Sequence, residues 1–238
     1  MRYTYKTQHG SFIIQSTTPA HVKFAPMVAA LLAESARARG TGIAKRSPEY
    51  LARKIQSGQA IIALHRDGRL AGFTYIETWG HGRYVANSGL IVVPEFRGCK
   101  LGKQLKRASF TLSRKNFPQA KIFSITTSPA VMKMNTELGF RPVPLYELTR
   151  DPAFWEGCRS CPNFDILQRN QFRMCLCTGL LFDPADAQRR HPLQRWMARL
   201  RPEKWMVYLQ SLFQQGMQLF QHRESVDKRV ENKLKTSK

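Results

Sequence analysis

The chain has 238 residues, enough for one or two domains, and 42% of them are hydrophobic, which excludes general disorder. No apolar run approaches the roughly 18 residues of a membrane span. The N-terminal residues lack the apolar segment of a secretory signal, so we expect a cytoplasmic protein. Lys and Arg number 38 against 16 Asp and Glu, a net charge of +22, which favours a polyanionic partner such as nucleic acid, an acidic membrane or a phosphorylated cofactor.

In chain order, the pattern predicts strands and helices that alternate up to about residue 145. Pro19 opens a helix, and Ser47 caps the next one with Pro48 at its first position. A third helix begins at Leu101. Strands are expected over 11–16, 60–65, 70–79, 85–93, 121–126 and 141–145, and helices over 19–40, 47–57, 101–118 and 129–138. This order predicts an α/β or α+β domain with a mixed sheet.

The turn RGCKLG, residues 97–102, lies between a buried strand and the helix that begins at Leu101. Unpaired amide groups and the helix dipole make such a turn an anion site, and its glycines let a ligand approach the backbone. Lys100, Lys103, Lys106 and Arg107 add positive charge. The turn is therefore expected to bind a pyrophosphate group.

This turn, the element order and ELGF at residues 137–140 together resemble the GCN5-related N-acetyltransferase (GNAT) family. The family's acyl-CoA signature is Arg/Gln-x-x-Gly-x-Gly/Ala. Arg97 and Gly102 match it, whereas Lys100 stands where the middle glycine belongs. The resemblance spans residues ~11–150 in element order. It implies a mixed sheet flanked by helices, with acetyl-CoA as co-substrate.

The resemblance also implies which residues contact acetyl-CoA. Backbone groups of the strand before the turn would align the pantetheine arm, and the turn itself would hold the phosphates. The implied cofactor-binding residues are Ile91, Val92, Val93, Arg97, Gly98, Cys99, Lys100, Leu101, Gly102, Lys103 and Ser128. Ser128 is equally well explained as the N-cap of the next helix.

Acyl transfer needs a neutral amine, a donor for the oxyanion and a proton for the thiolate. The family often places an acidic tyrosine five residues before the phenylalanine of its Gly-Phe pair. Here Asn135 occupies that position; it cannot give up a proton but can hydrogen-bond the sulfur. Glu77 and His81 are the candidate bases, with direct loss of the proton to water as the alternative.

Lys45 and Arg46 fall where the family builds its acceptor site, and two cations can hold a carboxylate. The alternative is a solvated basic loop. The segments RGTGIAKR, ETWGHG, ANSGLIVVPEFRG and CLCTG are similar to a bacterial subgroup associated with arginine-biosynthesis gene clusters. That similarity suggests an amino acid as acceptor.

Four of the five cysteines lie in a short Cys-rich element, 156–178, with the spacing CxxC and CxC. Soft thiolate ligands in this number favour tetrahedral zinc, and packed or redox-active thiols near the active site are the alternative. The expected metal ligands are Cys158, Cys161, Cys175 and Cys177.

The composition changes after residue 184, so we expect an acetyltransferase domain over 1–184 and a basic amphipathic helical tail over 185–238. The tail can dock on an anionic surface or nucleic acid, or pack on the domain or on a second subunit of a homodimer. The leading hypothesis is an acetyl-CoA-dependent N-acetyltransferase for a small primary amine, such as an amino acid of arginine metabolism. Two alternatives are a protein N-terminal or lysine acetyltransferase, and a non-catalytic, zinc-bearing module that binds nucleic acid on a degenerate GNAT fold.

Overall fold

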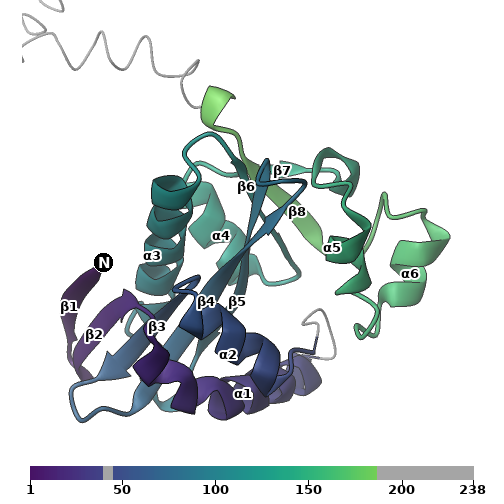
Figure 1. Ribbon diagram of the computed structural model, residues 1–238. Coiled ribbons are helices and arrows are strands. Elements are labelled where there is room, and N and C mark those ends of the chain that lie inside the picture. Colours follow the sequence, from purple (N-terminus) through teal and green to yellow (C-terminus); the bar gives the residue numbers. More distant parts are fainter. Residues whose placement is uncertain (40–44, 187–238) are drawn as a thin grey trace, which may run out of the picture. The chain divides into compact units, whose positions relative to one another are not determined.

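The computed structural model describes residues 1–39 and 45–186, which form a mixed sheet of eight strands flanked by helices (Figure 1). The strand order is β1-β2-β3-β4-β5-β6-β8-β7. The strands are β1 (Arg2–Thr7), β2 (Gly10–Ser16), β3 (Ala60–His65), β4 (Leu70–Trp79), β5 (Tyr84–Val92), β6 (Lys121–Thr126), β7 (Arg141–Val143) and β8 (Thr178–Phe182). The helices are α1 (Ala25–Arg39), α2 (Pro48–Gln56), α3 (Leu101–Asn116), α4 (Pro129–Glu137), α5 (Pro152–Glu156) and α6 (Phe164–Arg169).

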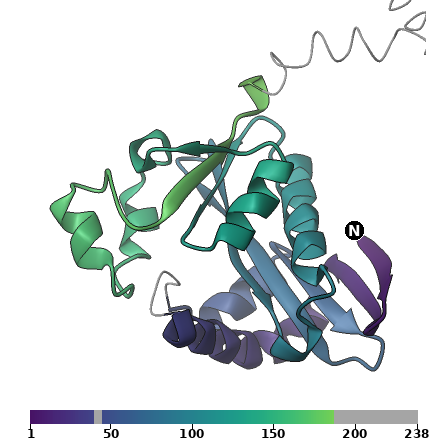
Figure 2. The ribbon, with the colours of Figure 1, turned by 180° about the vertical axis from the view of Figure 1, so that it is seen from behind.

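Helices cover both faces of the sheet, as the two opposite views show (Figures 1 and 2). α3 packs on one face through Leu101 and Leu105, which join a core with residues of β2 to β6. α1 and α2 pack on the other face through Leu32, Leu51 and Ile55. Both helix stripes follow from apolar residues three or four positions apart. A third cluster, which includes Phe123, Leu181 and Trp155, packs the segment of α5 and α6 against β6 and β8.

The predicted elements between residues 11 and 143 are confirmed, with shifts of a few residues at their ends. Ser47 caps α2 as expected, because its Oγ accepts a hydrogen bond from the amide of Tyr50 at 3.2 Å. Two strands were not predicted. β1 pairs antiparallel with β2, and β8 enters between β6 and β7 after the Cys-rich element. Among the described residues, no helix has both the length and the apolar character to cross a membrane.

Strands β5 and β6 form the single parallel pair among the described strands, joined by α3. Their register covers three positions, from Tyr84 opposite Lys121 to Ala86 opposite Phe123. Beyond these positions β5 continues to Val92 beside β4, while β6 pairs with β8. The two strands therefore part in the middle of the sheet.

A bulge in β5 shapes the same region. The register between β4 and β5 shifts between Phe73 and Tyr75, so β5 has one more residue than its partner there. Gly89 of β5 has φ +63°, and a Cβ atom at this position would lie 2.3 Å from Cε1 of Tyr75. Only glycine fits both the left-handed backbone and the tyrosine ring.

The expected tail, 185–238, lies almost wholly outside the described residues, as does the loop at 40–44 before Lys45. The residues from Met1 to Ala187 form one compact unit. The proposed division into a domain and a tail, and the tail's partners, therefore stay predictions.

Candidate active site

The turn between β5 and α3 has the backbone geometry of an anion site. Gly98 has φ +86° and Lys100 has φ +62°, so the position where the family signature has its middle glycine is left-handed. Within the described part of the chain, the amides of Gly98, Cys99 and Lys100 have no hydrogen-bond acceptor. They precede the first turn of α3, whose amides are also unsatisfied in any helix. These amides can hold phosphate oxygens.

Side chains from distant elements hold this turn in place. The hydroxyl of Tyr5 in β1 donates to the carbonyl oxygen of Cys99 at 2.9 Å. Arg97 Nε donates to the carbonyl oxygen of Val92 at 3.2 Å. Lys103 Nζ forms an ion pair of 2.6 Å with Glu137, which links the turn's helix to α4. Lys100 is exposed and forms no ion pair with any described residue, so its ammonium group is accessible to a ligand.

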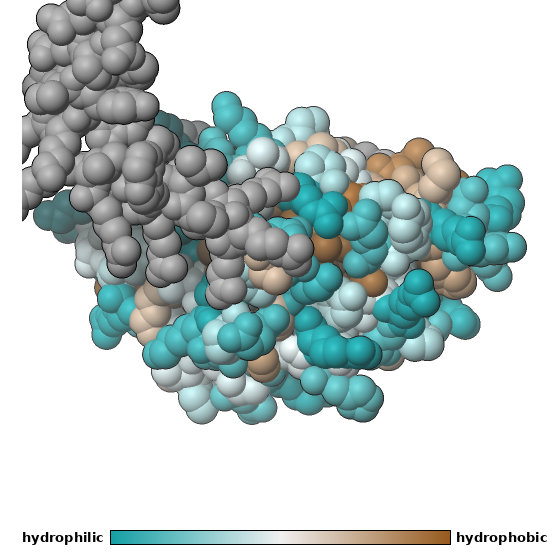
Figure 3. All heavy atoms as spheres, turned by 90° about the horizontal axis from the view of Figure 1, so that it is seen from above, coloured by the Kyte–Doolittle hydropathy of each residue, from teal (hydrophilic) through white to brown (hydrophobic). Residues whose placement is uncertain are grey.

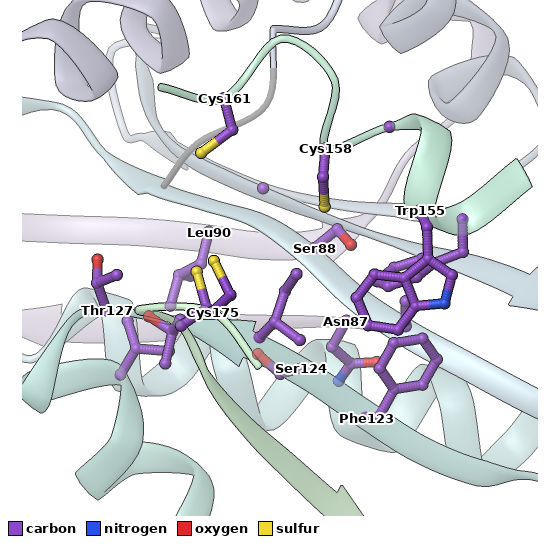
Figure 4. Close-up of a pocket in the computed structure, with 18 of the residues that line it drawn as sticks. Asn87, Ser88, Leu90, Phe123, Ser124, Thr127, Trp155, Cys158, Cys161 and Cys175 are labelled. Carbon is purple, nitrogen blue, oxygen red and sulfur yellow. The ribbon is translucent and has the colours of Figure 1, made fainter. Parts of the chain in front are cut away.

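A cavity of about 150 Å³ opens where β5 and β6 part (Figure 4). Asn87, Ser88 and Leu90 line it from β5, and Phe123 and Ser124 line it from β6. On the opposite side it is covered by side chains of the segment from α5 to β8. This segment also exposes the apolar residues Phe172, Met174 and Leu176. Seen from above, apolar surface lies among hydrophilic residues (Figure 3).

Arg46 and Tyr75 bring polar groups to the cavity wall from the face that α1 and α2 cover. Arg46 Nε donates to the hydroxyl oxygen of Tyr75 at 2.9 Å. Two residues along β4, the Glu77 carboxylate is 4% exposed and accepts a hydrogen bond from the hydroxyl of Tyr50. The Tyr50 and Tyr75 rings pack edge to face, 6.0 Å apart. These four side chains form one partly buried polar network, which we call the β4 network.

Charge within the β4 network fixes the protonation of its members. Burial and then the charge of Glu77 raise the pKa of Tyr75 to about 12, so this hydroxyl is neutral at pH 7. Burial alone would lower the pKa of Arg46, but Tyr75 and Glu77 outweigh it and raise the pKa. Burial also lowers the pKa of Lys54, which Glu77 partly restores. Arg46 therefore presents a permanent positive charge at the cavity.

Lys106 of α3 was expected at the phosphate turn, yet it is buried, with 2% of its surface exposed. It lines the cavity between β5 and β6, and its Nζ lies 5.3 Å from the centroid of the Phe140 ring. Burial lowers the pKa of Lys106 to about 7. A helical phase shared with Ser109 and Ser113, both buried, is the sequence signal that could have placed it.

The structure separates several residues that the sequence grouped together. Arg46 lines the cavity, whereas Lys45 is exposed and its amide donates to Ser160. His81 has φ +57° in an exposed turn and lines a different depression, so it does not lie with Glu77. Asn135 is fully buried and does not line the cavity. Neither polar atom of its amide has a hydrogen-bond partner among the described residues.

Of the remaining predicted acetyl-CoA contacts, Ile91 and Cys99 are buried, and Ser128 lies at the start of α4. Ile91, with 3% exposed, packs in the core of α1 and α2, so its contribution is limited to its backbone. Cys99 is buried and its Sγ donates to the carbonyl oxygen of Phe96, as expected of a packed thiol. Ser128 precedes α4 without a side-chain capping bond, and its amide donates to Thr126 Oγ1.

The four clustered cysteines line the cavity, but they do not converge as metal ligands. Cys158 and Cys161 point inward from one side, and Cys175 lies across the cavity from them (Figure 4). Within residues 1–39 and 45–186, no three His, Cys, Asp or Glu side chains are grouped to hold a metal ion. Burial raises the pKa of Cys158 to about 11 and that of Cys177 to about 12. The zinc prediction thus finds no support, and the thiols form part of the cavity wall.

Comparison with known proteins finds a family model that matches part of the chain. Residues 32–140 match the model of the acetyltransferase (GNAT) family, a range that contains β3 to β6, the turn and ELGF. No curated protein matches the sequence.

Many solved structures match the fold, including the following two. N-acetylglutamate synthase from Neisseria gonorrhoeae, complexed with coenzyme A and N-acetyl-glutamate, is 20% identical with a TM-score of 0.52. The match covers 72% of this chain but 35% of the synthase, about a third of its length. A protein from Mycobacterium tuberculosis in complex with CoA is 17% identical with a TM-score of 0.51, over 71% of this chain and 98% of that one. Residues 32–140 therefore match the acetyltransferase (GNAT) family, and the described residues share the fold of these two structures.

Proposed function

We propose that the chain transfers the acetyl group of acetyl-CoA to the primary amine of a small acceptor that carries a carboxylate, such as an amino acid. One observation carries this proposal. The cavity where β5 and β6 part lies beyond an anion-binding turn, and Arg46 stands in its wall. An anionic cofactor and an anionic acceptor can therefore meet there.

The fit to acetyl-CoA rests on the backbone. The amides of Gly98, Cys99 and Lys100 suit the pyrophosphate, with Lys100 as an exposed counter-charge. Beyond Ala86, β5 no longer pairs with β6. The backbone groups on this side of β5 can therefore hydrogen-bond the amides of the pantetheine arm, in the place where a neighbouring strand would otherwise pair. The thioester would then reach the cavity.

The fit to a carboxylated acceptor rests on charge. Arg46 is positively charged, and no Asp or Glu is found among the described residues that line the cavity. The guanidinium group of Arg46 is pre-oriented for a carboxylate, because it already donates to the hydroxyl of Tyr75 and to the carbonyl oxygen of Lys45. The synthase from Neisseria gonorrhoeae, crystallised with N-acetyl-glutamate, supports an amino-acid acceptor.

We assign Glu77 as the proton acceptor for the attacking amine. It shares with Tyr75 the face of β4 that borders the cavity, and it is buried with Tyr50 as its donor. A carboxylate in this position can take a proton from the amine through an ordered water or hydroxyl group. His81 and Asn135 are left out of this assignment, because His81 lies in an exposed turn at a different depression and the amide of Asn135 cannot take a proton.

A thiol-release assay with acceptor pairs tests the proposal. Amino acids such as glutamate and ornithine are compared with the same amines lacking the α-carboxylate. The full chain should acetylate an amino acid and discriminate against its decarboxylated partner. Arg46→Lys should raise KM for the amino acid about 10-fold or more, since a bidentate contact is lost, without changing the KM of acetyl-CoA. Equal turnover of both partners, or turnover of lysine peptides alone, would overturn the carboxylate assignment.

A further inference from the structure

Lys106 is a buried amine in a wall of the cavity that the acyl transfer described above does not use. It extends from α3, on the face of the sheet opposite Arg46 and the β4 network. One helical turn separates it from Gly102, the last glycine of the phosphate turn. A group on this side of the sheet approaches a bound thioester from the cofactor's side, whereas Arg46 approaches from the acceptor's side.

The surroundings of Lys106 leave its ammonium without a counter-ion. Within the described residues, no ion pair or hydrogen bond involves its Nζ. The ammonium group makes a cation–π contact with the ring of Phe140. The polar side chains beside it on β5 and α3, Asn87, Ser109 and Ser113, carry no charge, and Asn87 hydrogen-bonds to both serines. The other titratable side chains lining the cavity are Arg46, Tyr75 and four cysteines. A buried cation with no partner would gain one from an anion that forms in the cavity.

We propose that Lys106 is the proton donor to the departing thiolate of CoA. This inference rests on the proposed acetyltransferase function. The acceptor's nitrogen forms its bond to the carbonyl carbon, and the carbon–sulfur bond breaks with its electron pair moving to sulfur. Lys106 passes an ammonium proton to the sulfur, while Glu77 takes one proton from the amine nitrogen. Lys106 then regains a proton from water, and Glu77 returns its own, so the cycle closes.

No other cavity residue suits this role as well. Arg46 and Tyr75 bind their protons too tightly, given the raised pKa of each. Cys158 and Cys177 are held as neutral thiols by burial. Lys106, whose pKa burial lowers to about 7, both holds and releases a proton near neutral pH.

The decisive readout is the dependence of the rate on the acidity of the leaving thiol. Lys106→Met should lose much less rate with the acetyl thioester of a CoA analogue whose thiol is more acidic than with acetyl-CoA itself, because a weakly basic thiolate leaves without a proton. Lys115→Met, which removes an exposed cation from the same helix, should keep the parent rate with both thioesters. An equal loss of rate with the two thioesters in Lys106→Met would overturn the proposal.

Kinetics separate this inference from the proposed function. With an accepted amine, Lys106→Met should lower kcat about 100-fold with acetyl-CoA affinity unchanged, and should remove the fall in kcat as the pH rises past about 7. Lys106→Arg, which keeps the charge but holds its proton, should not restore the rate. Failure of the parent protein to bind acetyl-CoA would refute the function itself. An acetyl group found on Lys106 during turnover would make it a nucleophile and overturn its role as donor.

Discussion

The hydroxyl group of Tyr5 lies 2.9 Å from the carbonyl oxygen of Cys99 and donates a hydrogen bond to it, across 94 residues of sequence. Strand β1 thereby holds the turn that precedes α3. The same strand also contacts α3 through Tyr3, whose hydroxyl donates to the carbonyl oxygen of Gln104 at 3.4 Å. The edge of the sheet farthest from the cavity thus supports the phosphate-binding end of the site.

Tyr5→Phe tests whether this support matters for the cofactor. Loss of one hydrogen bond from a partly buried pair costs about 1 kcal/mol, so acetyl-CoA affinity should fall about 2- to 10-fold. Tyr3→Phe is the matched control, because its longer bond reaches the helix beyond the turn. Calorimetric titration of both variants with acetyl-CoA checks this. An equal effect of the two substitutions would argue against a specific role for Tyr5.

Glu77→Gln tests the assignment of the proton acceptor. The amide keeps the shape and can still accept from Tyr50, but it cannot take a proton from the amine. We expect kcat to fall about 100-fold, with little change in acetyl-CoA affinity. His81→Gln is the control, since His81 lies in an exposed turn outside the cavity, and it should retain the parent kcat. A loss of kcat in His81→Gln, with the parent kcat retained in Glu77→Gln, would instead identify His81 as the base.

Lys106 should make stability depend on pH. In the unfolded chain its pKa is near the ordinary 10.5, and burial lowers it to about 7 in the fold. Between these values the unfolded state binds the extra proton, so the free energy of unfolding rises with pH from about 7 to about 10.5. Below about pH 7 both states are protonated, and the cost of the buried charge is present in full.

Lys106→Met removes this cost. Its free energy of unfolding should exceed the parent's by about 3–5 kcal/mol at pH 7, and the difference should shrink towards pH 10. Chemical denaturation at the two pH values measures the gap, and Lys115→Met should show no such dependence because it is exposed. A gap that does not vary with pH would mean that Lys106 is neutral, or fully solvated, throughout.

Most of the fold between residues 11 and 143 could be predicted, because caps, turns and apolar periodicity are local signals. Ser47, Gly139 and the strand of residues 121–126 behave as their neighbours in sequence dictate. The place of β8 between β6 and β7 could not be predicted, because that pairing joins segments more than 30 residues apart with no local mark.

The sequence predicted the part of the site that a single short segment forms. It did not predict the part that several distant segments form together. The single short segment is the turn at Arg97–Lys103, and even the left-handed conformation of Lys100 follows from its glycine position. Lys106 was misplaced, because its sequence neighbours Lys103 and Arg107 made it look like part of a basic surface. The helix face that it shares with Ser109 and Ser113 is a local signal of its burial, whereas the parting of β5 and β6 beside it joins distant segments and has no local signal.

Acetyl-CoA titration of the full-length protein and of Gly102→Val tests the central claim, that the turn at Arg97–Lys103 binds the cofactor. A Cβ at Gly102 would meet nothing closer than Val92 Cγ2 at 3.6 Å, so the variant should fold, which circular dichroism checks. Its side chain would stand at the first turn of α3, where the phosphates are expected to approach. The account predicts saturable binding by the parent protein and a loss of at least about 100-fold in the variant, some 3 kcal/mol. Equal affinities in two folded proteins would contradict it.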